Sequence, residues 1–265
     1  AEVKMDSSGM DEISLTDPDA RQMKTRHVLD VCYNCHIAVE AENHLITNYT
    51  LDNDINDYAS LLPLARGSKE LMGKLDVSSD SGHFSLTNVL NLYKEGMNAN
   101  IPEYERGSPF RKKGVGGDEY ASSNFIYDRE RDLYICLQGN EMHYRFNVPN
   151  GLKNKVWYRI YSTDECKSSP AVNKCTKSRR GRWMLRWEYA DIEDEHWKRM
   201  KSRGRDKMKL RKSTVERPFG TIKRKMNQGY LLLKGLKKVK GEFGFSVIAY
   251  NMKREISIRG VRSLI

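Results

Sequence analysis

Residues 205–226 carry apolar side chains at helical spacing. The members of this stripe lie three, four or seven positions apart: Met208, Val215, Phe219, Ile222 and Met226. The spacing predicts a helix with one buried face, and Glu216 lies one position round from that face among several lysines. Pro218 lacks an N–H and would clash with the carbonyl four residues earlier, so we expect a kink or a break just after Glu216.

Before residue 103 the pattern alternates between strand and helix periods. The predicted elements are strands over residues 31–39, 44–51, 74–79 and 97–102 and helices over 57–75 and 85–94. Strands that alternate with helices indicate an α/β unit with a partly parallel sheet. In such sheets ligands bind beyond the carboxyl ends of the strands, which is where Asp80 lies. Asp57 stands at the start of a predicted helix and is interpreted as its cap.

Residues 104–204 differ in character and are predicted to form a β-rich insertion. The run RKKGVGG is followed by four short β-like stretches, over residues 133–138, 142–148, 156–161 and 183–189. A hairpin is expected around Gly139 and Asn140. A last helix is predicted over 236–254, with Leu236, Val239 and Phe243 on its apolar face. The chain is thus divided into a first core part (1–103), the insertion (104–204) and C-terminal helices that close the core (205–265).

The charge of the chain is strongly uneven. Residues 1–103 carry eight Lys or Arg and seventeen Asp or Glu, whereas the remainder carries 38 and 18, respectively. Residues 201–240 alone hold fifteen Lys or Arg against two acids, Asp206 and Glu216. This asymmetry indicates that the second half binds a polyanion. A lone carboxylate among so many cations is well placed to work beside a phosphate backbone and a metal ion.

The cysteines and the apolar runs bear on the cellular setting. Five cysteines, an odd number, and no visible signal peptide favour a reducing cytoplasm over a disulfide scaffold. No apolar run approaches the length of a membrane span. Cys32 and Cys35 form a CxxC pair, but a spacing of three on a strand sends them to opposite faces, so no metal or redox site is expected there.

Several segments, taken in order, resemble one family. They are SLTDPDARQMKTR, CYNCHIAVEAENHLI, DNDINDYASLLPLA, DVSSDSGHFS, YICLQG, VERPFGTIKR and GLKKVKGEFGFSVIAYNMKR. Together they resemble the C-terminal two-thirds of bacterial insertion-sequence transposases of the DDE class, over nearly the whole chain. The resemblance implies a ribonuclease-H-like α/β core, a mixed sheet flanked by helices. It also implies a cytoplasmic, nucleoid-associated bacterial enzyme that cleaves DNA and transfers strands at insertion-sequence ends.

The resemblance also implies the metal-binding residues. The family holds two divalent ions, Mg²⁺ or Mn²⁺, on three carboxylates, and the second and third of these correspond to Asp80 and Glu216. Hard cations prefer carboxylate oxygens. Two such ions can activate the attacking oxygen and stabilise the leaving one in phosphodiester transfer.

A family signature of Tyr, Arg, Glu and Lys surrounds the third carboxylate. This chain keeps the Glu and the Lys, as Glu216 and Lys223, but has Lys212 and Lys209 at the Arg and Tyr positions. The partner implied is double-stranded DNA, at transposon ends and target, and synaptic relatives work as homodimers. The expected DNA-binding residues are Lys209, Arg211, Lys212, Arg217, Lys223, Arg224 and Lys225.

The insertion holds a second candidate site. Many relatives have a cysteine cluster here that resembles a structural zinc site, and this chain retains Cys136, Cys166 and Cys175. Ser169 stands where another cysteine is usual. Because a closed zinc site needs four ligands, we expect no tightly held zinc.

Only two of the three carboxylates are accounted for. In the family the first Asp follows a first core strand that would lie upstream of residue 1, so a fragment with two unpaired inner sheet edges is expected. Asp6 and Asp57 are the internal alternatives. Two other functions remain open: a non-catalytic DNA-binding remnant that binds through residues 201–240, and a nucleic-acid module that binds through residues 104–204.

Overall fold

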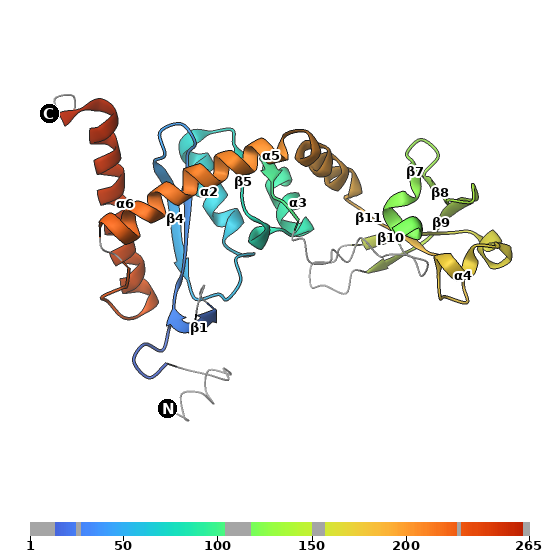
Figure 1. The fold of residues 1–265 in the computed structure, drawn as a ribbon, viewed down its shortest axis with the longest axis horizontal. Coiled ribbons are helices and arrows are strands. Elements are labelled where there is room, and N and C mark those ends of the chain that lie inside the picture. Colours follow the sequence, from blue (N-terminus) through green and yellow to red (C-terminus); the bar gives the residue numbers. More distant parts are fainter. Residues whose placement is uncertain (1–13, 25–27, 104–117, 150–156, 227–228, 262–265) are drawn as a thin grey trace. The chain divides into compact units, whose positions relative to one another are not determined.

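A computed structural model describes residues 14–24, 28–103, 118–149, 157–226 and 229–261 (Figure 1). The chain forms two units: residues 1–102 with 195–265, and residues 103–194. Asp6 and the run RKKGVGG lie outside the described residues. In the described part of the chain, no helix combines the length and the apolar character needed to cross a membrane.

The first unit is a mixed α/β structure, as the alternating pattern predicts. Its elements are β1 (Arg21–Lys24), β2 (Leu29–Cys32), β3 (Asn34–Val39), β4 (Ile46–Asp52), α2 (Leu61–Met72), β5 (Asp76–Ser78), η1 (Ser81–His83), α3 (Leu86–Lys94), β6 (Asn98–Asn100), α5 (Ala190–Gly220), η5 (Thr221–Lys225) and α6 (Leu236–Arg259). β1 pairs with β2 and β3 with β4 in antiparallel fashion, and β5 pairs with β6 in parallel.

The strand predicted over residues 31–39 is two strands in the structure. β2 ends at Cys32 and pairs with β1, whereas β3 begins at Asn34 and pairs with β4. Between them the Tyr33 hydroxyl donates a hydrogen bond to the Asp17 carboxylate at 2.8 Å. The alternation of side chains was correct, but it carries no information on where a strand changes its partner.

Helix α5 is longer than its apolar stripe predicts. It begins at Ala190 rather than at Arg205, so residues 190–204 are helical and not part of a β-rich insertion. The helix also continues past Glu216 and through Pro218, and the irregularity follows Gly220 as the π-helical turn η5. The expected break just after Glu216 is therefore displaced, and a wider turn is a common response to a lost backbone hydrogen bond.

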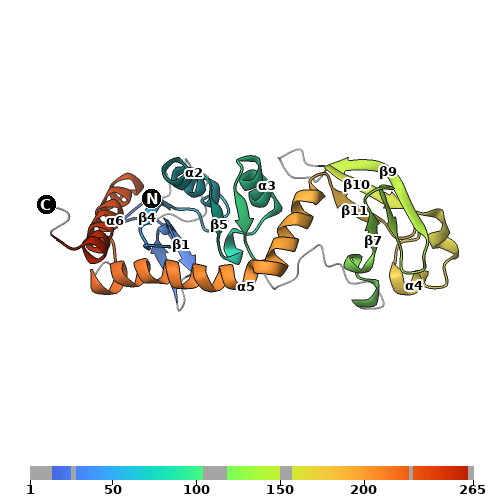
Figure 2. The same ribbon diagram turned by 90° about the horizontal axis from the view of Figure 1, so that it is seen from above.

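Helices cover both faces of the strands in the first unit. Figure 2 shows α5 along one side of the strands and α2 and α3 on the other. His196 of α5 is fully buried and lies within 3.2 and 3.1 Å of the carbonyl oxygens of Ala99 and Ile101, at the end of β6. Burial lowers the pKa of His196, and the contacts with the two carbonyl oxygens oppose this shift.

An apolar cluster of this unit joins α6 and η5 to β4. Its buried members are Ile46, Leu51, Ile222, Val239, Phe243, Val247 and Tyr250. The apolar face predicted for the last helix is thus confirmed. Gly244 lets α6 approach β4 closely, because a Cβ there would lie only 2.4 Å from the hydroxyl oxygen of Tyr49.

The second unit is built on a five-stranded antiparallel sheet in the order β11-β10-β9-β8-β7. Its elements are η2 (Asp118–Tyr120), η3 (Ser122–Asn124), β7 (Ile126–Asp128), β8 (Leu133–Ile135), β9 (Glu141–Pro149), β10 (Trp157–Ser162), η4 (Asp164–Ser168), α4 (Val172–Cys175) and β11 (Met184–Trp187). The predicted hairpin joins β8 to β9, and Gly139 adopts a left-handed φ of 81° in its turn.

Side-chain hydrogen bonds fix α6 to the start of β4 and give a testable prediction. Asn251 accepts from the Ile46 N–H and donates to the Ile46 carbonyl, both at 2.9 Å. Asn251→Ala leaves both backbone groups without these partners and should lower the free energy of unfolding by about 1–3 kcal/mol. Urea denaturation followed by circular dichroism measures this loss. The exposed Lys253→Ala on the same helix is the control, and equal midpoints for the two variants would contradict the prediction.

Candidate functional site

A cavity of about 500 Å³ lies in the first unit between β3 and β5. α2 contributes Leu61, Leu64 and Ala65 to its wall, and α5 contributes Leu210 and Thr214. Among the described strands, β3 pairs only with β4 and β5 only with β6, and both strands line this cavity. The absence of a central strand between them, expected from the family resemblance, stays a prediction.

Asp80 lies at the carboxyl end of β5, as predicted, on the wall of this cavity. It precedes the short helix η1, and its Oδ1 lies 2.9 Å from Nδ1 of His83. Its other oxygen, Oδ2, accepts a hydrogen bond from Arg211 at 2.7 Å. The hydrogen bond with His83 and the charge of Arg211 outweigh burial and lower the pKa of Asp80 to about 2. The carboxylate is therefore ionised at any physiological pH.

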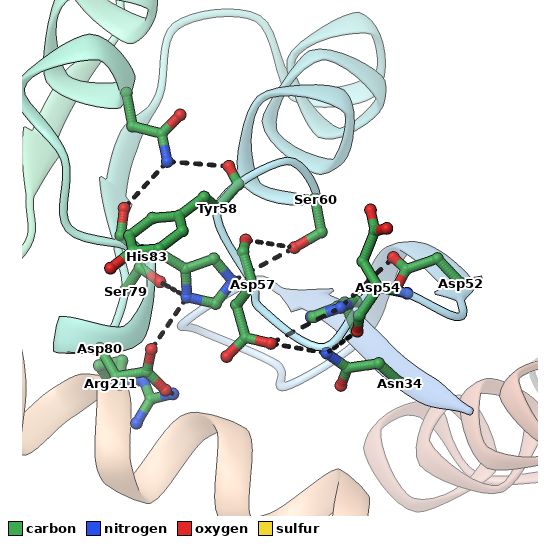
Figure 3. A network of polar contacts seen from close by, with 12 residues as sticks. Asn34, Asp52, Asp54, Asp57, Tyr58, Ser60, Ser79, Asp80, His83 and Arg211 are labelled. Atoms are coloured by element: carbon green, nitrogen blue, oxygen red, sulfur yellow. Dashed lines mark hydrogen bonds and ion pairs between the residues drawn. The ribbon is translucent and has the colours of Figure 1, made fainter. Parts of the chain in front are cut away.

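Asp57 joins this site instead of capping a helix. α2 begins at Leu61 with Ser60 at its N-cap, so the predicted role of Asp57 as a helix cap is wrong. The Asp57 carboxylate instead accepts a hydrogen bond from Asn34 at 2.7 Å (Figure 3). The turn between β4 and α2 carries Asp57 back toward β3, because the helix starts four residues later than the apolar pattern indicates.

Three potential metal ligands converge at this point. One ligand atom each from Asp57, Asp80 and His83 lies within 4.8 Å of the others. Two carboxylates and an imidazole at this spacing can bind a divalent cation. His83 was not among the predicted site residues, although its position three residues after Asp80 in the segment DSGH was a usable signal.

Glu216 is not part of this convergence. It is exposed on α5, and it does not line the cavity that its neighbours Thr214, Val215 and Phe219 help to form. The geometry of a helix explains this, because Arg211 and Glu216 are five residues apart and so point about 140° away from each other. The structure does not bring Asp80 and Glu216 together, and their pairing at a metal site stays a prediction.

The predicted DNA-binding residues fall into two groups. Arg211 is turned inward, where it pairs with Asp80. The other six are exposed on α5 and η5: Lys209, Lys212, Arg217, Lys223, Arg224 and Lys225. These exposed cations are suited to binding a polyanion.

The three cysteines of the second unit line one small cavity of about 30 Å³. Cys136, Cys166 and Cys175 surround it together with Ser169. All three are free thiols, and burial raises the pKa of Cys175. Fold geometry thus brings the retained cysteines together, but the absence of tightly held zinc stays a prediction because a fourth cysteine is missing.

Comparison with known families gives one match. Residues 135–256 match a family model described as a transposase DDE domain. The matched range contains Glu216, the three cysteines of the second unit and the exposed cations of α5 and η5, and it does not contain Asp80. No curated protein and no solved structure matched the chain. The family match supports a DDE-type transposase.

Proposed function

We propose that this transposase cleaves DNA and transfers strands at the ends of an insertion sequence, with Mg²⁺ or Mn²⁺ as cofactor. The observation that carries the proposal is the position of Asp80. Its carboxylate is ionised, lies at the carboxyl end of β5, and is contacted by Arg211 from the helix whose outer side carries the exposed cations. A carboxylate suited to metal binding thus contacts the inner side of α5, and cations suited to a phosphate backbone lie on the outer side of the same helix.

The proposed core is ribonuclease-H-like, with a strand between β3 and β5 that joins the two strand pairs into one sheet. The two free edges and the apolar cavity between them favour this arrangement. Asp80 and Glu216 are the proposed metal-binding carboxylates. Glu216 would join Asp80 if the C-terminal part of α5 turned about its axis when DNA binds. Divalent ions at these carboxylates would supply Lewis-acid activation of the attacking and leaving oxygens.

The residues of the chain have separate roles in this proposal. Asp80 would hold a metal ion, while Arg211 keeps the carboxylate ionised and oriented. Lys223 would bind a phosphate group as a point charge, and Phe219 holds the ammonium group 5.5 Å above its ring. The partner is double-stranded DNA in the bacterial cytoplasm, next to the nucleoid, and a homodimer would bring two transposon ends together.

A second candidate is a DNA-binding protein without catalytic activity. The exposure of Glu216 and the pairing of Asp80 with Arg211 are the observations that favour it. Both candidates predict DNA binding by the same helix. Only metal-dependent cleavage separates them.

The first test addresses catalysis. Asp80→Asn and Glu216→Gln in the transposase should each abolish Mg²⁺-dependent cleavage of the cognate DNA end and leave DNA affinity within about twofold, because only the metal-binding charge is removed. Cleavage is measured on end-labelled duplexes. Asp206→Asn, an exposed acid on the same helix, is the matched control. Full cleavage by either variant would exclude that residue from the metal site, and no cleavage by an enzyme that includes the first core strand and its Asp would favour the DNA-binding alternative.

The second test addresses the basic surface. Replacing Lys223, Arg224 and Lys225 by Gln should flatten the dependence of log affinity on log salt concentration by about one unit per lost phosphate contact. Fluorescence anisotropy at several salt concentrations measures this slope. The matched control replaces three exposed lysines of the second unit by Gln: Lys167, Lys174 and Lys177. If only the control variant changed the slope, DNA would bind to the second unit instead.

A further inference from the structure

Two potential metal ligands that the proposed function does not use, Asp57 and His83, lie beside Asp80. Asp57 comes from the turn between β4 and α2, whereas Asp80 and His83 come from the turn after β5. Their ligand atoms lie within 4.8 Å of one another, and Figure 3 shows the side chains pointing toward a common centre. Two separate turns therefore supply one set of oxygen and nitrogen donors.

The partners of these side chains hold the donor atoms in place. Asn34 donates to Oδ1 of Asp57 at 2.7 Å, and Arg211 donates to Oδ2 of Asp80 at 2.7 Å. Arg211 thus engages the Asp80 oxygen that faces α5, and Oδ1 remains on the side of His83. Neighbours that orient first ligands in this way are a regular feature of metal sites.

His36 provides an independent indication of a ligand. Its side chain is only 7% exposed, and its Nε2 has no hydrogen-bond partner among the described residues. That nitrogen lies at the edge of the cluster, 3.4 Å from an oxygen of Asp52 and 4.0 Å from Oδ1 of Asp57. A buried polar atom without a partner is unfavourable, so the orientation of His36 calls for a bound group. Its ring meets that of His83 edge-on, with centroids 5.9 Å apart.

Gly82 keeps a small space open between the two carboxylates. A Cβ at this position would lie 3.0 Å from Oδ2 of Asp57 and 3.2 Å from Oδ1 of Asp80. One oxygen of each carboxylate therefore faces the same space, which any side chain larger than hydrogen would begin to fill. Glycine at this position is compatible with an ion held between Asp57 and Asp80.

We propose that Asp57, Asp80 and His83 bind one divalent metal ion, with His36 as an additional nitrogen donor. The mixed donor set favours Mn²⁺ over Mg²⁺, because imidazole suits transition metals whereas Mg²⁺ takes almost only oxygen ligands. This inference rests on the proposed function in sharing Asp80, and it adds Asp57 and His83 as ligands. The Asp57 carboxylate lies close enough to Asp80 to share a metal ion without any movement of α5.

The test is a titration of the 265-residue protein with Mn²⁺ in the absence of DNA, followed by the electron paramagnetic resonance signal of the free ion. We expect saturable binding of one Mn²⁺ per chain, with Mg²⁺ as a weak competitor. Asp57→Asn and His83→Asn should each lower Mn²⁺ affinity by about tenfold or more, because each removes a ligand. His83→Asn should change Mg²⁺ affinity much less than Mn²⁺ affinity.

Gly82→Ala tests the proposed position of the ion most directly, since it retains every ligand and only fills the space between the two carboxylates. It should also weaken Mn²⁺ binding. The matched controls are Asp54→Asn, an exposed acid beside the cluster, and His143→Asn, an exposed histidine of the second unit; both should bind like the unaltered protein. Circular dichroism in EDTA shows which variants fold, and if Asp57→Asn does not, His83→Asn and Gly82→Ala decide the result.

The outcomes separate this inference from the proposed function. Absence of saturable Mn²⁺ binding, or unchanged binding in His83→Asn and Gly82→Ala, would overturn the inference even if Asp80→Asn abolished DNA cleavage. Conversely, Mn²⁺ binding that these variants weaken, together with full DNA cleavage by Asp80→Asn, would support the metal site and contradict the catalytic proposal.

Discussion

The incomplete pairing of β3 and β5 is the constraint on which the first unit depends. Each strand pairs along one edge only among the described strands, so its ladder alone cannot position it. α5 provides further contacts to β5 and to the turn after it. Lys207 pairs with Asp76 at 3.3 Å, and Arg211 pairs with Asp80 at 2.7 Å. One helix therefore holds both ends of β5 in place, and the cavity between the strands stays open beneath it.

The same helix separates two electrostatic environments. Its inner side presents Arg211 to the acidic cluster, where the hydrogen bond with His83 and the charge of Arg211 together lower the pKa of Asp80. Its outer side presents exposed cations that are suited to a phosphate backbone. A metal-binding group and a DNA-binding surface can thus be adjacent without cancelling each other.

The competing accounts of the site differ in which acid accompanies Asp80. Glu216 would have to move, because helical geometry places it on the outer side of α5 when Arg211 faces inward. Asp57 is already within reach, since the turn before α2 directs it toward β3. Asp80 is common to both accounts because it follows a parallel strand, where the carboxyl ends of neighbouring strands leave room for ligands.

The sequence by itself determined the elements and the distribution of charge. Apolar periodicity located β8 to β11, α3 and the buried face of α6, because burial of one face imposes a repeat that can be counted. The strand pattern also placed Asp80 after β5, and the distribution of charge along the sequence pointed to the cations of α5. Only the tertiary structure decided that Asp57, His36 and His83 meet Asp80, that Arg211 turns inward and that Glu216 turns outward. These outcomes depend on where helices and strands end and on which of them pack together. Local periodicity would be the same for other ends and other packing partners, so it cannot distinguish them.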